Sequence, residues 1–411
     1  MDFDTPIDRT GTASFKWELY GPDALPLWIA DMDFASPPAV VAALERRARH
    51  GVFGYSLVTD SMYGALIDYL ERHYGWRVER DWFVWLPSVV PGVSLACRAF
   101  AGPGEAVMLV TPAYPPFLEE LPPQGFRLVK VPSTRTRTVG GEKTTGGVIS
   151  AAGPPTGAGD RSGPPGEASP SWSLPLDKME AALTPDTRMF LLCQPHNPLG
   201  RVWRRDELAA IGDFCRRHDL VLCSDEIHCG LVLDDIPHVP AATVSDDAAA
   251  RTVTLMSPSK TFNLPGLNFA FAVIPDEDLR RRYVATAEGL LPFPGCFALT
   301  AAEAAYREGG EWHTELLQYL RGNRDLVERF VADELAPLTT THVEATYLAW
   351  IDARGLGVAE PARFFREAGV ALSDGADFGA PGWLRLNFAC PRSTLEEALR
   401  RMKRAVAAQS R

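Results

Sequence analysis

Strand-like apolar runs alternate with amphipathic helical stretches between about Phe83 and Val273. Such alternation is typical of a largely parallel sheet covered by helices. One helical stretch, Arg205–Arg217, begins with acidic and ends with basic residues, as the helix dipole favours. The fold class is therefore α/β, with seven expected strands at Phe83–Leu86, Ala106–Val110, Arg127–Val131, Met189–Cys193, Leu220–Ser224, Val253–Met256 and Ala270–Ile274.

The segments on either side of this region do not continue the alternation. After residue 290 the pattern is mixed α and β, which predicts a smaller α+β domain over residues 291–411. Residues 1–49 are expected to contribute to this small domain, and residues 50–290 to form the large one. The elements expected in the small domain are a long helix, a strand, a helix, a strand and a last helix, at Leu299–Phe330, Tyr347–Ile351, Pro361–Ala368, Trp383–Phe388 and Thr394–Ala407.

Residues 133–173 differ in composition from the rest of the large domain. They are rich in Gly, Pro, Ser and Thr and contain almost no large apolar residue. Such a composition buries too little apolar surface to offset the entropy of ordering the chain. We therefore expect a flexible surface insertion between two strands, with a lid over the site as the alternative.

Composition and charge exclude several classes of protein. With 46% apolar and 23% charged residues, the chain can bury one large core or two that share an interface. No apolar run approaches the roughly 20 residues of a membrane helix, and the acidic N-terminus lacks the regions of a signal peptide. A net charge of −11 argues against a nucleic-acid-binding face, and the seven cysteines show neither disulfide nor zinc spacing. We expect a cytoplasmic protein that binds neither membrane nor nucleic acid.

Lysine is rare in this chain, occurring only at Lys16, Lys130, Lys143, Lys178, Lys260 and Lys403. Lys260 follows the expected strand Val253–Met256 and closes the motif Ser257-Pro258-Ser259-Lys260. Burial at the carboxyl end of a strand, where ligands of α/β sheets collect, lowers the pKa of an ammonium group and gives a nucleophilic amine. The Ser257 hydroxyl can bind a phosphate oxygen. Ser-x-x-Lys alone is a weak motif, and a plain surface lysine is the alternative.

Two further strand ends carry residues that suit an aromatic cofactor. Asp225 follows Leu220–Ser224 and can pair with a protonated pyridine nitrogen, while His228 lies close enough to reach a phenolic oxygen. A metal site made of Asp225, Glu226 and His228 is the alternative. Asn197 follows another strand and offers an amide donor. The Asn197–Pro198 bond is a candidate cis peptide, although a proline-rich turn explains this motif as well.

The first two expected strands are also followed by residues that could bind parts of a cofactor. Ser88, Val89 and Val90 begin an expected helix, whose free N–H groups form an anion site suited to phosphate, although ordinary capping explains Ser88 equally well. Tyr114 can stack on a cofactor ring. One residue of interest thus follows each of five expected strands, and one sheet would place all five around one cavity. These residues are Ser88, Tyr114, Asn197, Asp225 and Lys260.

The amino-acid sequences of these motifs, and their order along the chain, resemble those of the fold-type I pyridoxal-phosphate (PLP) enzymes. In particular they resemble the MalY/PatB-type cystathionine β-lyase, or C–S lyase, family. The resemblance spans nearly the whole chain and is more specific for the family than for the substrate. The motifs that carry it are Lys16–Trp17, Leu25–Phe34, Gly51–Tyr55, Pro195–Trp203, Ser224–His228, Ser259–Asn263 and Leu384–Pro391.

The resemblance implies a role for each matching residue. Lys260 would bind PLP as a Schiff base and then act as the catalytic base, and Arg385 would clamp the substrate α-carboxylate with help from Asn197. Tyr55, also a catalytic candidate, would reach the phosphate of the neighbouring subunit, which implies a homodimer with shared active sites. The other implied cofactor contacts are Asp225 at the pyridine nitrogen, Asn197 and His228 at the phenolic oxygen, Tyr114 on the ring, and Ser88, Val89, Val90 and Ser257 at the phosphate.

Two features depart from the pattern of related families. Aminotransferase-type relatives often carry an arginine eight residues after the lysine, whereas this chain has Asn268 there, which fits the lyase branch better. The insertion over residues 133–173 is longer than the resemblance implies. Substrate access depends on whether this insertion lies outside the cleft.

The reaction implied by the resemblance is cleavage of L-cystathionine or a related cysteine S-conjugate to a thiol, pyruvate and ammonia. The nearest alternative is a PLP-dependent aminotransferase, which shares the residue types around the cofactor. A biosynthetic lyase acting on a specialised cysteine S-conjugate is another. A regulatory binding module is disfavoured, because a pure binder needs no Schiff-base lysine beside Asp225 and Asn197.

Overall fold

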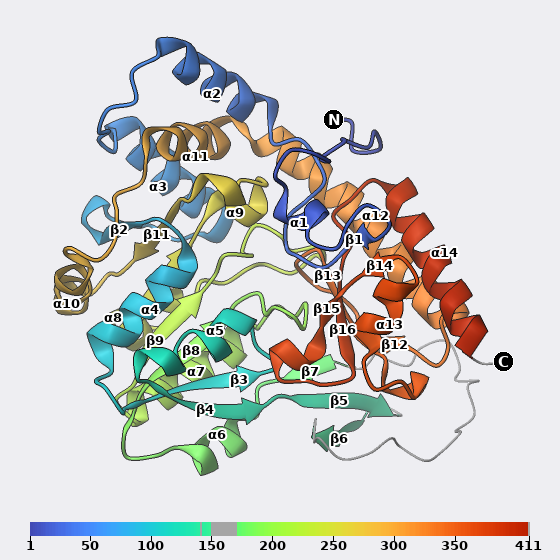
Figure 1. Cartoon of the computed structure of the whole chain (residues 1–411). Helices are drawn as coiled ribbons and strands as arrows, with labels where there is room; N and C mark the ends of the chain where they lie inside the picture. Colours follow the sequence, from blue (N-terminus) through green and yellow to red (C-terminus); the bar gives the residue numbers. More distant parts are fainter. Residues whose placement is uncertain (140–141, 149–170, 410–411) are drawn as a thin grey trace.

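A seven-stranded sheet forms the centre of the computed structural model, which describes residues 1–139, 142–148 and 171–409 (Figure 1). The strand order is β2-β11-β10-β9-β8-β3-β4, and every neighbouring pair is parallel except the two that β11 makes. The prediction of a mostly parallel sheet of seven strands is confirmed. Its strands are β2 (Phe83–Leu86), β3 (Ala106–Thr111), β4 (Arg127–Pro132), β8 (Thr187–Cys193), β9 (Val221–Asp225), β10 (Thr252–Met256) and β11 (Ala270–Val273).

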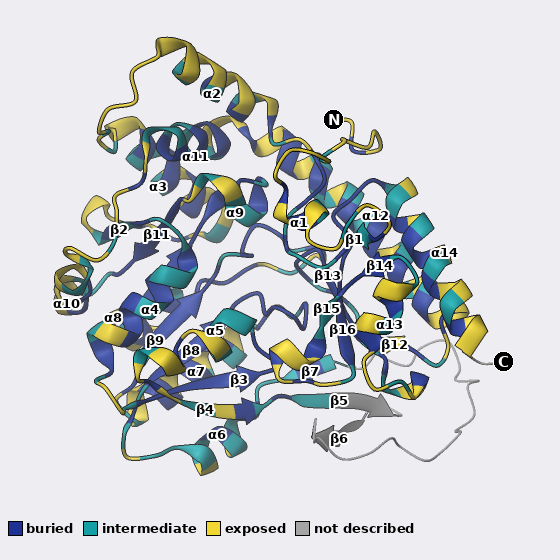
Figure 2. Cartoon of the chain, viewed as in Figure 1, coloured by how far each residue is buried: buried dark blue, intermediate teal, exposed yellow. Residues whose placement is uncertain are grey.

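Both faces of this sheet are buried, because successive residues of a strand point to opposite sides. In β8, Met189 joins a hydrophobic cluster with α4 (Val89–Phe100), whereas Phe190 joins another with α7 (Arg205–Arg217). The strands accordingly lie buried between helices (Figure 2). Further α-helices are α1 (Phe15–Glu18), α2 (Pro38–His50), α3 (Asp60–Tyr74), α5 (Pro115–Glu119), α6 (Leu176–Ala182), α8 (Asp246–Arg251), α9 (Pro258–Thr261) and α10 (Glu277–Ala287).

The C-terminal part contains an antiparallel sheet in the order β12-β13-β16-β15. The N-terminal segment pairs with the C-terminal part in a separate two-stranded sheet, in which β1 (Leu25–Pro26) runs parallel to β14 (Val370–Ala371). The limits of the two domains stay a prediction. The expected elements are present as β13 (Leu348–Asp352), α13 (Pro361–Glu367), β16 (Trp383–Asn387) and α14 (Arg392–Gln409), beside the short strands β12 (Thr339–Thr340) and β15 (Ser373–Asp374).

The prediction of one long helix over Leu299–Phe330 is wrong. The structure has two helices there, α11 (Cys296–Glu308) and α12 (Gly310–Glu334), separated at Gly309. A Cβ atom on Gly309 would lie 2.5 Å from the Ala305 carbonyl oxygen and 2.7 Å from the ring of Phe262. The chain therefore turns at a position where close packing requires glycine.

The flexibility of the insertion over residues 133–173 stays a prediction, but its described ends contain strands that the sequence did not indicate. They form a three-stranded sheet of β5 (Thr134–Val139), β6 (Glu142–Val148) and β7 (Ser171–Ser173). Trp172 of β7 is buried in a cluster with Trp350 and Trp383 and donates a hydrogen bond to Thr341 Oγ1 at 3.2 Å. One large aromatic residue thus anchors the end of the segment. The remaining residues, 140–141 and 149–170, lie outside the described part of the chain.

Among the helices that the structure describes, none is both long enough and apolar enough to cross a membrane.

Candidate active site

The carboxyl ends of five strands meet at a cavity of about 250 Å³. In an α/β sheet these ends lie along one edge, where ligands bind. The structure brings together at this cavity all the residues predicted from the strand ends, namely Ser88, Val89, Val90, Tyr114, Asn197, Asp225, His228, Ser257 and Lys260. Residues that the sequence did not assign to the site also line it, among them Ala30, Cys193, Ser259, Asn268 and Phe269.

Lys260 lies in α9, directly after β10, and its side chain lines the cavity. Its amine donates a hydrogen bond to the Ala30 carbonyl oxygen at 2.6 Å. Burial, followed by the Arg385 cation, lowers the pKa of Lys260 from 10.5 to about 8, against the opposing effect of Asp31 and Asp225. About a tenth of this amine is therefore neutral and nucleophilic at pH 7, far more than for a lysine of ordinary pKa.

Asp225 ends β9 and is buried, with 4% of its surface exposed. Burial raises the pKa of this carboxyl to about 7, although a hydrogen bond from the Ile227 backbone N–H opposes the shift. A cation placed beside Asp225 would relieve this unfavourable burial. A ring nitrogen that carries a proton meets that requirement.

His228 lies three residues beyond Asp225 and is also buried. Burial lowers its pKa well below the ordinary value, so the ring is neutral, and its Nδ1 atom has no hydrogen-bond partner among the described residues. A buried polar atom without a partner costs free energy unless a ligand satisfies it. His228 and Asp225 therefore both fit a bound polar ring.

The neighbouring Glu226 does not face this cavity. One carboxylate oxygen accepts hydrogen bonds from Ser224 Oγ and the Ala241 N–H, both at 2.9 Å, and the other lies 2.7 Å from His238 Nε2. Glu226 thus serves a buried structural network and does not join Asp225 and His228. The described residues contain no group of three or more side chains that suits a metal ion.

The start of α4 forms one end of the cavity, where Ser88, Val89 and Val90 line it. Ser88 occupies the N-cap position, but its side chain makes no capping hydrogen bond and remains available to an anion. Backbone N–H groups at a helix start also favour negative charge. The Ser257 hydroxyl, in contrast, already donates to the Phe269 carbonyl oxygen at 2.6 Å, so contact with a phosphate requires it to rotate.

Arg385 extends from β16 to the edge of the cavity. Its guanidinium donates to Asn197 Oδ1 at 3.0 Å and to the Trp28 carbonyl oxygen at 2.9 Å, and lies 4.7 Å from the centre of the Phe378 ring. Burial lowers its pKa to about 10, so it stays charged at neutral pH. No carboxylate of the described residues pairs with it, and its Nε has no hydrogen-bond partner among them. Such a cation is prepared for an anionic ligand.

Asn197, Tyr114 and Tyr55 complete the predicted set. The Asn197–Pro198 bond is cis, as the sequence predicted. Tyr114 lines the cavity, and burial raises the pKa of its phenol. Tyr55 is fully exposed and does not line this cavity. Its predicted contact with a second subunit stays a prediction.

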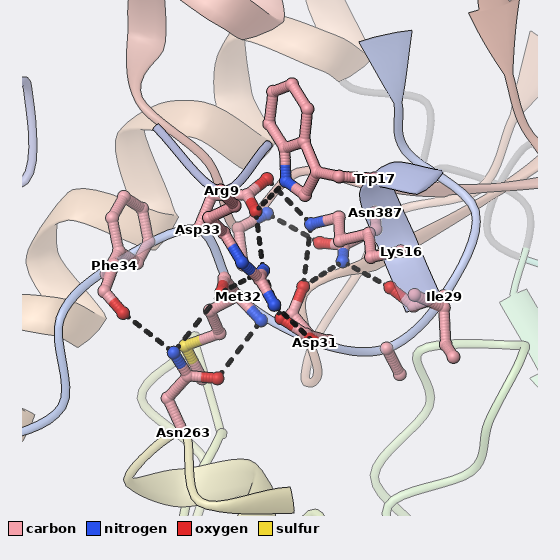
Figure 3. Close-up of polar contacts among 12 residues, drawn as sticks. Arg9, Lys16, Trp17, Ile29, Asp31, Met32, Asp33, Phe34, Asn263 and Asn387 are labelled. Atoms are coloured by element: carbon pink, nitrogen blue, oxygen red, sulfur yellow. Dashed lines mark hydrogen bonds and ion pairs between the residues drawn. The ribbon is translucent and has the colours of Figure 1, made fainter. Parts of the chain in front are cut away.

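The Ala30 carbonyl belongs to a segment held by a polar network that the sequence did not predict (Figure 3). The buried Lys16 amine lies 2.7 Å from Asp33 Oδ2 and donates to the Asp31 carbonyl oxygen at 2.8 Å. Arg9 pairs with both Asp31 and Asp33, at 2.7 and 2.8 Å. Charges buried in this way need several partners at once, which this network provides.

Two asparagines fix the same segment from opposite sides (Figure 3). Asn387, at the end of β16, donates to the carbonyl oxygens of Ile29 and Asp31. Asn263, three residues after Lys260, donates to those of Met32 and Phe34. Segment 28–34 is thereby positioned so that the Ala30 carbonyl meets the Lys260 amine. Both asparagines stand in motifs that carry the resemblance, but a backbone-binding role leaves no pattern in the sequence.

The chain matches known proteins over its whole length. The family model for aminotransferase class I and II matches residues 163–402. Cystathionine beta-lyase PatB of Bacillus subtilis is 35% identical and covers 99% of this chain and 100% of its own. The crystal structure of OvoB matches with a TM-score of 0.88 and 41% identity over 99% and 100% of the two chains.

The solved structure of a third relative contains a cofactor. Cystalysin from Treponema denticola, whose structure contains pyridoxal 5'-phosphate, matches with a TM-score of 0.86 and 29% identity over 99% of both chains. The fold-type I architecture is therefore common to this chain and its relatives. The chain belongs to the aminotransferase class I and II family and, within it, to the C–S lyase group typified by MalY and PatB.

Proposed function

We propose that this pyridoxal-phosphate enzyme of the C–S lyase type cleaves the Cβ–S bond of L-cystathionine or a related L-cysteine S-conjugate. The conjugate and one water give a thiol, pyruvate and ammonia. The observation that carries the proposal is the Lys260 amine, whose pKa of about 8 suits a nucleophile and a base, in a cavity that also holds the buried Asp225. The family of the chain supplies the reaction class.

The residues around the cavity fit the cofactor. Asp225 would pair with its ring nitrogen, because a cation there relieves the burial of the carboxylate. Asn197 and the unpartnered His228 would meet its phenolic oxygen, and Tyr114 would stack on its ring. The remaining phosphate contacts would be Ser88, Val89, Val90 and Ser257. Each residue would thus offer the neighbouring part of PLP an opposite charge, a hydrogen bond or a stacking contact.

When bound, PLP supplies an electron sink that stabilises negative charge at the substrate Cα. The chain contributes orientation and proton transfer. Arg385 would hold the substrate α-carboxylate with Asn197 as its neighbour, which fixes the direction of the Cα–H bond. Lys260 would remove the Cα proton as a neutral amine, held beforehand by the Ala30 carbonyl.

A homodimer in the cytoplasm is part of this proposal. Segment 51–58 exposes Val52, Phe53, Tyr55 and Leu57, with exposed fractions from 57% upward. Several large apolar residues exposed side by side mark an interaction surface. A second copy of this chain would cover them and receive Tyr55 at its phosphate site.

The competing function is transamination, for which the same residue types around the cofactor would serve. Product analysis separates the two. Purified holoenzyme is incubated with L-cystathionine, with and without an added α-keto acid, and pyruvate is measured. We expect pyruvate without the keto acid. If no pyruvate forms and the added keto acid is instead converted to its amino acid, the enzyme is an aminotransferase.

A matched variant tests the role of the lysine in the same assay. Lys260→Ala is expected to lose pyruvate formation and the absorption band of lysine-bound PLP. Lys178→Ala, which changes a lysine outside the cavity, should retain both. Equal activity of wild type and Lys260→Ala would contradict the proposal.

A further inference from the structure

Four charged side chains lie together around segment 28–34 (Figure 3), whose Ala30 carbonyl receives the Lys260 amine. They are Arg9, Lys16, Asp31 and Asp33. Two cations face two anions, so the group carries no net charge. None of the four lines the catalytic cavity, and any effect of their charges on the site is therefore exerted at a distance.

The two carboxylates differ in the number of their partners. Asp33 accepts hydrogen bonds from the Lys16 amine at 2.7 Å and from the Trp17 indole at 2.9 Å, and Arg9 adds a third at 2.8 Å. Asp31 meets Arg9 alone, through two guanidinium nitrogens at 2.7 and 3.0 Å. No other cation of the described residues pairs with Asp31. Without Arg9, Asp33 would keep two partners and the Asp31 carboxylate would keep none.

Asp31 lies close enough to Lys260 to influence its amine. It directly follows Ala30, whose carbonyl oxygen accepts the amine at 2.6 Å. The negative charge of Asp31 opposes the lowering of the Lys260 pKa, and it does so more strongly than that of Asp225, which lines the cavity. Charges act on each other in this way over short distances in a medium of low dielectric constant. Asp31 without a cation would therefore stabilise the ammonium form of Lys260 and reduce its reactive fraction.

The other groups that face Lys260 have different tasks. Arg385 of β16 and Asp225 of β9 act on its amine with opposite signs, and in the proposed function they meet the substrate and the cofactor. His228 is neutral, because burial lowers its pKa well below the ordinary value. Burial also acts against the charge of Arg9, but its two carboxylate partners raise the guanidinium pKa above the ordinary value. Arg9 thus remains a permanent cation outside the cavity.

We propose that Arg9 keeps the Lys260 amine reactive by neutralising Asp31. Arg9 touches neither the cofactor nor the substrate, so it is a positioning residue that acts through Asp31. This inference rests on the proposed function, because it concerns the lysine of that site. It gives a role to a residue that the sequence did not single out, and it explains why a carboxylate can stand next to Ala30 without inactivating the amine.

The test measures the reactivity of the Lys260 amine in the full chain freed of PLP. Trace acetic anhydride, which is small enough for a cavity of about 250 Å³, is added across the pH range around 8, and mass spectrometry of the digest gives the acetylation of Lys260 relative to the exposed Lys130. The wild-type midpoint is expected near pH 8. Arg9→Met should raise this midpoint by about half a unit, which lowers the labelling of Lys260 at pH 7 about threefold.

Variants of the partner residue separate the effect of charge from that of structure. Asp31→Asn removes the negative charge and should lower the midpoint of Lys260. The double variant Arg9→Met with Asp31→Asn has no net change in charge and should return to the wild-type midpoint. A merely structural role of the ion pair predicts instead that the double variant resembles Arg9→Met, since both lack the pair. Arg9→Lys, which keeps the cation, should stay close to wild type.

A matched control removes a cation elsewhere. Arg77→Gln breaks an exposed ion pair with Glu71 and should leave the midpoint of Lys260 as in wild type. An unchanged midpoint in Arg9→Met, or a double variant that keeps the Arg9→Met value, would overturn the inference. Should Arg9→Met fail to fold, Asp31→Asn tests the same charge from the other side, and a midpoint there that is unchanged or higher would overturn it as well.

The labelling experiment separates this inference from the proposed function, because it needs neither cofactor nor substrate. Midpoints that move as expected, in a protein that forms no pyruvate from any cysteine conjugate, would refute the proposed function alone. Midpoints that stay fixed in all variants, in a protein that forms pyruvate, would refute the role of Arg9 alone.

Discussion

Lys260 is a residue whose reactivity is set by its surroundings. Burial, followed by the Arg385 cation, lowers its pKa from 10.5 to about 8. Only the neutral amine attacks a carbonyl, so the reactive fraction rises as the pH increases through about 8. We expect the rate of PLP capture by the apoenzyme to rise across that pH and then level off. Stopped-flow absorption measures this rate.

Arg385→Met provides the matched comparison. Loss of the cation raises the pKa of Lys260, so the midpoint of the rate profile should move to higher pH. Because PLP itself titrates identically in both experiments, the difference between the profiles reports on the protein. A wild-type rate that keeps rising toward pH 10.5 would show that burial does not activate the amine.

The buried Lys16–Asp33 pair is expected to matter for stability. Lys16→Met leaves the Asp33 carboxylate buried with one cation fewer, and loss of one partner from such a pair costs about 3 kcal/mol. Urea unfolding of the holoenzyme measures the change. Arg77→Gln breaks an exposed pair with Glu71 and should cost less than about 1 kcal/mol. Equal losses in the two variants would argue against a special role for the buried network.

The residues that follow strand ends could be predicted, and those of the polar network could not. Asp225 and Lys260 stand directly after apolar runs, so the sheet geometry alone brings them together. Lys16 and Asn387, in contrast, meet segment 28–34 only through tertiary packing.

Among the elements, the break between α11 and α12 gives a direct test. Gly309→Ala would force a Cβ against the Ala305 carbonyl and the Phe262 ring, which costs about 1–3 kcal/mol. Gly310→Ala meets no atom within 4 Å and is expected to be neutral or slightly stabilising. Thermal unfolding compares the two alanine variants. A lower melting temperature for Gly310→Ala than for Gly309→Ala would contradict the packing argument.

The strands of the central sheet were predictable because both of their faces are buried. Each therefore appears as a continuous apolar run, such as Met189–Cys193 within β8. The break at Gly309 was missed, although the dipeptide Gly309-Gly310 is a helix-stop signal that the sequence displays. Trp172 was missed because a single aromatic in a polar segment carries no periodic signal, although its burial orders the end of that segment.

At the scale of the whole molecule, the exposed segment 51–58 predicts a dimer. We expect sedimentation equilibrium of the holoenzyme to give twice the mass of one 45.0 kDa chain. Tyr55→Phe removes one hydroxyl and should weaken PLP binding about tenfold without dissociating the dimer, as the loss of one phosphate hydrogen bond implies. Leu57→Ser tests the apolar contact and should shift the equilibrium toward monomer. A monomeric holoenzyme with full activity would contradict the shared site.

The overall α/β architecture followed from the sequence, because alternation of strands and helices leaves few topologies. The site then followed from the rule that ligands bind at the carboxyl ends of the strands. What the sequence left open was the space around the site. Only the structure shows that a second cavity, of about 870 Å³, adjoins the site at Tyr114 and Arg385.

The central claim is that Lys260 carries the cofactor. Reduction of the holoenzyme with borohydride fixes a lysine-bound PLP permanently, and mass spectrometry of the digested protein locates it. We predict that the modified peptide contains Lys260 and that the other five lysines remain unmodified. Modification of another lysine, or of none in protein reconstituted with PLP, would contradict the account.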